Sequence, residues 1–184
     1  MTLRNASLRR LALLVGDRLR RRGVEAVLTG GACVSIYTRN RYQSYDLDFV
    51  LLAAQDKKAA GEALRELGYR PDGRHFRHSD TPFLVEFLAP PLSIGAAPVR
   101  KIAEIRAGRR TLRLLSPTDC VKDRLAAFYF WNDRQSLEQA VLVALRHRID
   151  MKDVKAWSES EGMAERFAVF LRQWKEKKNQ RAAR

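Results

Sequence analysis

Residues 44–50 read SYDLDFV, and Asp46 and Asp48 alternate with apolar residues at the start of a segment that stays apolar to Leu52. This pattern predicts a largely buried β-strand. Because successive side chains of a strand point to opposite faces, Asp46 and Asp48 project to the same side, within a few ångströms of each other. Two carboxylates so placed repel one another unless a divalent cation lies between them, so the pair favours a metal site. A solvated strand end produces the same pattern, and for an isolated Asp-x-Asp it is the commoner case.

A glycine pair precedes this strand. Residues 25–29 read EAVLT, a short apolar run that leads into Gly30-Gly31 and then into residues 32–38, where a short helix is predicted. In a strand–turn–helix of this kind, glycine leaves the backbone amides at the helix N-terminus open to a phosphate group. A side chain at Gly31 would occupy the space of a phosphate oxygen, so we expect Gly31→Val to weaken nucleotide binding. A tight turn without a ligand is the other interpretation.

A third carboxylate lies in another predicted strand. Glu86 is the single charge in residues 82–88, which read PFLVEFL. Burying an unpaired carboxylate among apolar residues costs several kcal/mol unless a cation or hydrogen-bond donors compensate, so Glu86 is a candidate ligand, unless its face is open to solvent. Ser44, two residues before Asp46, is placed to direct a hydroxyl at the same site or to serve as a simple turn residue.

The remaining N-terminal pattern is that of a mixed α and β unit. Apolar residues at helical spacing over residues 8–19 predict an amphipathic helix that ends at Gly23. Asp56 is a good N-cap for a further helix that stops at Gly68. A hairpin is expected over residues 102–115.

From Ser116 onward the pattern becomes helical, with Pro117 at the first helical position. We expect a nucleotide-binding core over residues 1–115, a helical unit over residues 116–178 and a basic tail over residues 179–184. Three tryptophans, which lie in helical stripes, are expected in the core rather than on a base-stacking surface: Trp131, Trp157 and Trp174.

Composition bears on the partners. The 184 residues contain 35 Lys plus Arg against 21 Asp plus Glu, a formal charge of +14, which attracts polyanions such as RNA. A general preference for arginine at solvated positions is the alternative. The two cysteines, Cys33 and Cys120, have no metal-ligand spacing and indicate buried thiols in a reducing compartment. Since no apolar run approaches the roughly 20 residues that cross a bilayer and no secretory signal is evident, a cytoplasmic protein without a membrane partner is expected.

Four motifs, taken in order, resemble the polymerase-beta-like nucleotidyltransferase superfamily. They are TGGA (residues 29–32), SYDLDFV (44–50), VEFL (85–88) and LSPTD (115–119), the last followed by Lys122. Within the superfamily, the chain is most similar to the AbiEii and MenT-type nucleotidyltransferase toxins of bacterial toxin–antitoxin systems. The resemblance covers residues 25–145, and it depends on the order of the motifs rather than on any one of them.

The resemblance implies an α+β fold, in which a mixed, twisted sheet is flanked by helices and followed by a helical unit. It also implies two Mg²⁺ ions, for which Mn²⁺ is an alternative, held by Asp46, Asp48 and Glu86. Glu86 would help to deprotonate the attacking hydroxyl. The nucleotide-binding residues that it implies are Gly30, Gly31, Ser44 and Lys122.

The implied activity is transfer of a nucleoside monophosphate from an NTP to a hydroxyl group, with release of pyrophosphate. The charge favours RNA as acceptor, with the acceptor end of tRNA as one candidate, and the toxin resemblance adds a cognate antitoxin as a partner. Three alternatives stay open: a protein acceptor, a small-molecule acceptor such as an aminoglycoside, and a non-catalytic module that keeps the fold and binds nucleic acid or a partner. An aminoglycoside would call for an acidic pocket.

The chain departs from the superfamily pattern in some respects. The stretch between Gly31 and Asp46 is longer than usual, and the third acid is Glu86 rather than the more common aspartate. Lys122 is a less secure assignment because Arg124 is close in sequence. Asp133 falls near an acid of such toxins but is equally placed to cap the next helix.

Overall fold

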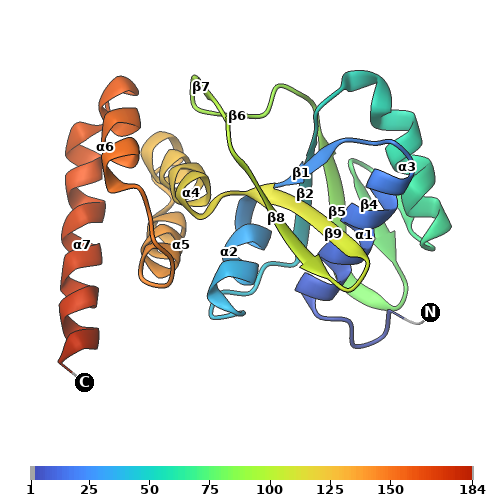
Figure 1. Cartoon of the computed structure of the whole chain (residues 1–184), viewed down its shortest axis with the longest axis horizontal. Helices are drawn as coiled ribbons and strands as arrows, with labels where there is room; N and C mark the ends of the chain where they lie inside the picture. The colour runs from blue at the N-terminus through green and yellow to red at the C-terminus, as the bar shows by residue number, and fades with distance from the viewer. Residues whose placement is uncertain (1–2, 184) are drawn as a thin grey trace.

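The computed structural model describes residues 3–183 (Figure 1). Its first half contains α1 (Leu8–Arg21), β1 (Ala26–Leu28), α2 (Gly30–Thr38), β2 (Asp46–Leu51), the short 3-10 helix η1 (Ala54–Asp56), α3 (Lys57–Glu66), β3 (Arg70–Asp72), β4 (His75–His78) and β5 (Thr81–Leu88). It continues with β6 (Ser93–Ile94), β7 (Ala97–Pro98), β8 (Ile102–Ala107), β9 (Arg110–Leu115), α4 (Pro117–Trp131), α5 (Arg134–Ala144), α6 (Met151–Ser160) and α7 (Ala164–Ala182).

One seven-stranded sheet forms the centre, with the strand order β3-β4-β5-β2-β1-β9-β8. β2 is parallel to β5 and β1 is parallel to β9, whereas the other neighbours are antiparallel. The expected fold class, a mixed sheet flanked by helices, is therefore confirmed. β2 is an inner strand, and its Leu47 and Phe49 are fully buried while Asp46 and Asp48 alternate with them. Burial of the apolar side chains leaves the two carboxylates together on the other face.

Helix α1 has the predicted amphipathic character and packs against β1 and β9. Its apolar residues Leu8, Leu11, Val15 and Leu19 are buried, because they recur at helical spacing along one side. After the helix ends at Arg21, Gly23 adopts a φ of +72°, as a residue that reverses the chain does.

The helical unit begins where the sequence predicts it. The Ser116 hydroxyl accepts a hydrogen bond from the Asp119 amide at 3.1 Å and so caps α4, with Pro117 in the first turn. Figure 1 shows α4 and α5 beside α2, with α6 and α7 on the outside. The apolar core is continuous between the sheet and this unit, because Leu114, Val121 and Phe170 belong to one cluster.

One expectation about this unit, that Trp131 lies in the core, was wrong. Trp131 is 77% exposed, whereas Trp157 is buried, because Trp131 is the last residue of α4 and extends beyond the packed helices. The segment expected to be a basic tail is helical as far as Ala182, since α7 is tied to α5: Trp174 Nε1 donates to the Ala144 carbonyl at 3.2 Å. Within residues 3–183, no helix has the length and apolar character that crossing a membrane requires.

Candidate active site

Asp46 and Asp48 stand at the start of β2, where three elements meet. The Thr29 backbone N–H and hydroxyl both donate to the Asp48 carbonyl, at 2.9 and 3.2 Å, which holds the end of β1 against β2. On the other side, Asp48 is the register partner of Glu86 on the parallel strand β5. Partners in neighbouring strands share a face about 4.8 Å apart, so the fold places all three predicted carboxylates on one face of the sheet.

The start of α2 lies directly against this group. Gly30 has a φ of +67°, and a Cβ atom built on it would stand 2.7 Å from Asp48 Oδ2. Glycine is therefore required at Gly30 both by the backbone conformation and by the carboxylate beside it. A Cβ on Gly31 would instead meet Ser44 Oγ at 3.2 Å and the Tyr42 ring at 3.3 Å, so Gly31 faces the loop that leads into β2.

The carboxylates perturb one another. Burial raises the pKa of Asp48, the charges of Asp46 and Glu86 raise it further, and Arg124 opposes them, with the result that the pKa is about 6. Asp46 is exposed and Asp48 is partly buried. An anionic group of this kind is stabilised by any cation that reaches it.

Glu86 has partners that sequence reasoning missed. Its side chain is 15% exposed, with His75 Nε2 at 3.3 Å from Oε2 and Arg74 Nε at 3.6 Å from Oε1. His75 is the register partner of Glu86 across the antiparallel β4–β5 pair. The turn at residues 73–74 joins β3 to β4, and the turn at residues 79–80, which was not predicted from the sequence, folds β4 back onto the strand of Glu86.

The donor chemistry of this site suits a hard divalent cation, because carboxylate oxygens are the ligands that Mg²⁺ prefers. The three side chains do not converge, however: residues 3–183 contain no group of three or more His, Cys, Asp or Glu side chains in a metal-holding arrangement. Glu86 turns toward Arg74 and His75, so Asp46 and Asp48 form the part of the predicted metal site nearest to α2.

Ser44 is buried and takes part in the turn before β2. Its hydroxyl donates to the Asp46 carbonyl at 3.1 Å and lies 3.3 Å from the Asp46 amide, while the Ser44 amide donates to Ser35 Oγ at 2.7 Å. Ser44 therefore sets the direction in which Asp46 leaves the loop.

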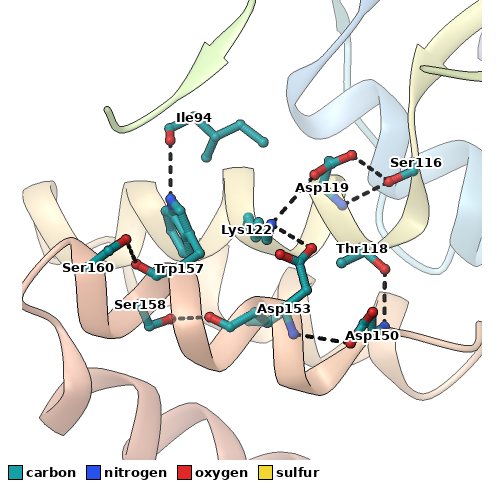
Figure 2. A network of polar contacts seen from close by, with 11 residues as sticks. Ile94, Ser116, Thr118, Asp119, Lys122, Asp150, Asp153, Trp157, Ser158 and Ser160 are labelled. Atoms are coloured by element: carbon teal, nitrogen blue, oxygen red, sulfur yellow. Dashed lines mark hydrogen bonds and ion pairs between the residues drawn. The ribbon is translucent and has the colours of Figure 1, made fainter. Parts of the chain in front are cut away.

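The structure pairs Lys122 with carboxylates other than Asp46, Asp48 and Glu86. Its Nζ lies 2.7 Å from Asp153 Oδ2 on α6 and 3.9 Å from Asp119 Oδ1, as Figure 2 shows. This ion pair, in which Lys122 is buried and Asp153 is exposed, borders a cleft of about 710 Å³ between α4, α6 and the segment before β8. Arg100 and Lys101 also line the cleft.

Arg124 is the cation of α4 whose charge acts on Asp48. Its guanidinium donates to Asp123 Oδ2 from Nε at 2.9 Å and from Nη2 at 2.6 Å. Asp133, the other acid noted in the sequence, accepts from the Ser136 amide at 3.2 Å and caps α5. Arg124 and Asp123 thus belong to the candidate site. The sequence alone did not assign either residue to it.

No protein-family model and no curated protein matches the chain. Solved structures do. An antigenic nucleotidyltransferase-like protein from Paracoccidioides brasiliensis aligns over 78% of each chain with a TM-score of 0.56 and 13% sequence identity. The antibiotic-resistance factor ANT(2'')-Ia aligns over 95% of this chain and 100% of its own, with a TM-score of 0.51 and 12% identity. The fold is that of the nucleotidyltransferases.

Within this nucleotidyltransferase fold, the site combines two capacities. The Asp46–Asp48 pair can attract a cation, and the amides at the start of α2 can bind an anion, because helix N-termini present unpaired N–H groups. Both groups meet at the contact between Gly30 and Asp48.

Proposed function

We propose that the chain is a nucleotidyltransferase that transfers a nucleoside monophosphate from an NTP to a hydroxyl group and releases pyrophosphate. The observation that carries this proposal is the position of Asp48, whose carboxylate lies against Gly30 at the N-terminus of α2 and beside Glu86 on the neighbouring strand. A metal-binding carboxylate and a phosphate-binding helix terminus are the two parts that phosphoryl transfer needs within reach of one substrate.

Each residue has a role in this proposal. Asp46 and Asp48 would hold magnesium, for which manganese is an alternative, and Glu86 would join them on leaving Arg74 and His75. When bound, two such ions would supply positive charge to the triphosphate. The amides of Gly30 and Gly31 bind the triphosphate, with Ser44 placing Asp46.

Two further roles depend on charge and proton transfer. Glu86 accepts the proton of the attacking hydroxyl, and His75 is placed to stabilise its carboxylate. Arg124 on α4 supplies positive charge near Asp48. Lys122, predicted for the same purpose, reaches the nucleotide after exchanging Asp153 for a phosphate.

RNA is the acceptor that we propose, because the formal charge of +14 attracts a polyanion. With RNA as acceptor, we also propose that the chain is a toxin with a cognate antitoxin. This role predicts that expression of the chain arrests growth and that Asp48→Asn relieves the arrest.

The experiment is incubation with each labelled NTP, Mg²⁺ and total cellular RNA, with Asp48→Asn as the control. We expect label on one size class of RNA from the parent and none from the variant. If none of the NTPs labels RNA, protein or a small hydroxyl acceptor, the chain is not a nucleotidyltransferase.

A small-molecule acceptor is the second candidate. The cleft of about 710 Å³ beside α4 contains Asp119, Asp150 and Asp153, which suit a cationic ligand, although Arg100 and Lys101 oppose it. The likeness to ANT(2'')-Ia, an antibiotic-resistance factor, also raises this candidate. Adding aminoglycosides to the labelling reaction separates the two, because label then moves from RNA to the small molecule.

A further inference from the structure

Three segments that are distant in sequence meet at the C-terminal end of α2. His147 Nε2, just after α5, lies 2.8 Å from the Tyr37 carbonyl in the last turn of α2. Arg181, in the last turn of α7, donates from Nη1 to the Leu145 carbonyl at 3.0 Å. The ends of α2, α5 and α7 therefore form one surface.

Four arginines gather on this surface: Arg39, Arg41, Arg146 and Arg181. Burial lowers the pKa of Arg146, and the charges of Arg41, Arg181 and Arg39 lower it further, so each of these three arginines lies within electrostatic range of Arg146. Arg39, Arg41 and Arg181 are exposed. We refer to these four residues as the arginine cluster.

The arginine cluster is not neutralised from within. Across residues 3–183, none of the recorded ion pairs joins a carboxylate to any of its four members, in contrast to Arg18, which pairs with Glu66 at 2.9 Å. Helix C-termini favour cations by about 0.3–1 kcal/mol, which accounts for Arg181 over the end of α5. It does not account for Arg41, which lies beyond the end of α2. Like charges held together without a counter-charge favour the binding of a polyanion.

The cluster is connected to the candidate active site by the loop of residues 39–45. The loop starts at the cluster and returns alongside α2, because the Tyr42 ring lies 3.3 Å from the Cβ position of Gly31. α2 has nine residues and is therefore roughly 13 Å long.

A hollow beside the cluster favours nucleic acid over other polyanions. It has a volume of about 320 Å³ and is lined by His147, Arg148, Trp174 and Lys178, together with Leu145, whose carbonyl accepts from Arg181. Lys178 Nζ lies 4.9 Å from the centre of the Trp174 ring. Proteins that bind a single strand stack its bases on aromatic rings and bind its phosphates through nearby cations.

Arg39 caps α2, whose Tyr37 carbonyl contacts His147. Arg146 stands between His147 and Leu145, whose carbonyl accepts from Arg181.

We propose that Arg39, Arg41, Arg146 and Arg181 bind the phosphate backbone of the acceptor, a single-stranded RNA segment whose reacting end lies at Asp48. This proposal rests on the proposed function for the identity of the acceptor. The cluster sets the path of the strand along α2 and leaves the chemistry to the carboxylates.

The test replaces all four arginines by glutamine and compares this variant with a control of equal charge change. The control carries Arg9→Gln, Arg10→Gln, Arg65→Gln and Arg70→Gln, which are exposed residues of α1, α3 and β3. Figure 1 shows α1 and α3 on the opposite side of the molecule from α6 and α7. The probe is a fluorescent single-stranded RNA of about 12 nucleotides, within the usual range of such sites. Binding is measured in EDTA without NTP, so the result does not depend on catalysis.

We expect the cluster variant to lose about tenfold or more in affinity and the control about threefold or less. The slope of log K against log salt should flatten by about 3 in the cluster variant, since each of the four phosphate contacts contributes about 0.7. Equal losses in the two variants, or equal competition by inorganic polyphosphate and by RNA, overturn the proposal. If the fourfold variant does not fold, the pair Arg39→Gln and Arg41→Gln, which changes only the exposed loop, gives the same comparison.

The binding result and the labelling result are independent. RNA binding through the cluster without nucleotidyl transfer by the parent contradicts the proposed function only. Transfer to RNA that is equally efficient in the cluster variant and the parent contradicts the inference only. If both hold, the variant raises the KM for RNA and keeps the KM for NTP.

Discussion

At the scale of single residues, the contact between Gly30 and Asp48 defines the candidate site. The carboxylate occupies the space in which any other residue at Gly30 would place its Cβ. The negative charges of Asp46 and Glu86, which share its face of the sheet, raise the pKa of the same carboxylate. A carboxylate that other negative charges destabilise in the free protein, and that lies at a helix N-terminus, is typical of a functional site rather than of a structural one.

Asp48→Asn should abolish nucleotidyl transfer without loss of stability. The variant loses a metal ligand, and it also relieves the repulsion among the three carboxylates, so the melting temperature should stay the same or rise. The measurement is NTP-dependent labelling and thermal unfolding on one sample. Asp72→Asn, which changes an exposed aspartate paired with Arg77, is the control and should keep full activity. Full activity in Asp48→Asn would remove Asp48 from the site.

Gly30→Ala and Gly31→Ala should differ in stability. Alanine at Gly30 is strained at a φ of +67° and meets Asp48 Oδ2 at 2.7 Å, so we expect a loss of about 2 kcal/mol, or roughly 4–8 °C in melting temperature. Alanine at Gly31 has no such strain and meets only side chains at 3.2 Å or more, which can shift. Equal losses in the two variants, measured by thermal unfolding, would contradict this account of Gly30.

At the scale of elements, charged pairs that are partly withdrawn from water occur both within one helix and between two helices. Asp17 on α1 is buried and lies 2.7 Å from Arg21 Nε and 3.2 Å from Arg20 Nη2. Lys122 joins α4 to α6 through Asp153. The pair between two helices orients them, because leaving one partner buried and unpaired is costly.

The pair at Asp17 should make the stability of α1 depend on pH. Burial raises the pKa of Asp17, but the hydrogen bonds and charges of Arg21 and Arg20 outweigh it and hold the pKa below its ordinary value. The ionised form therefore stabilises the fold above the unfolded pKa of about 3.9, and this contribution is lost as the pH falls through the lowered pKa. We expect Asp17→Asn to cost about 1 kcal/mol at pH 7, because the arginines are half exposed, and less below pH of about 4. Urea unfolding across this range measures it, and a difference independent of pH would contradict the assignment.

A double-mutant cycle should reveal coupling between Lys122 and Asp153. Asp153→Asn leaves the buried Lys122 ammonium with only Asp119, at 3.9 Å, and we expect a loss of about 1–2 kcal/mol that is partly recovered in the double variant with Lys122→Met. Chemical unfolding of the four proteins gives the coupling energy. Additive losses would show that the ion pair contributes nothing to the packing of α6 on α4.

At the scale of the whole molecule, the charged groups are unevenly placed. The carboxylates lie where β2, β5 and α2 meet, and the unneutralised arginines lie at the far end of α2. A protein with this division can hold a cation and a polyanion at the same time.

Ligand binding at the carboxylates should stabilise the entire fold. Magnesium with a non-hydrolysable NTP analogue should raise the melting temperature of the parent, because a ligand that binds only the folded state contributes about 2.7 kcal/mol at a hundredfold excess over Kd. EDTA should reverse the shift, and Asp48→Asn should show none. An equal shift in Asp48→Asn, measured by calorimetry, would place the ligand elsewhere.

The sequence by itself determined the elements and the local features of the site. Alternation in SYDLDFV placed Asp46 and Asp48 on one face of β2, and Ser116 with Pro117 marked the start of α4. These features depend on residues a few positions apart, whose side-chain directions follow from strand and helix periodicity.

The tertiary structure alone decided which distant residues meet. It paired Glu86 with Arg74 and His75 and turned Lys122 toward Asp153 on α6. It also gathered the arginine cluster from the loop after α2, the segment after α5 and the last turn of α7. The physical reason is that these contacts depend on strand register and on how helices pack, and both are set by burial of the whole apolar core rather than by any short stretch of chain.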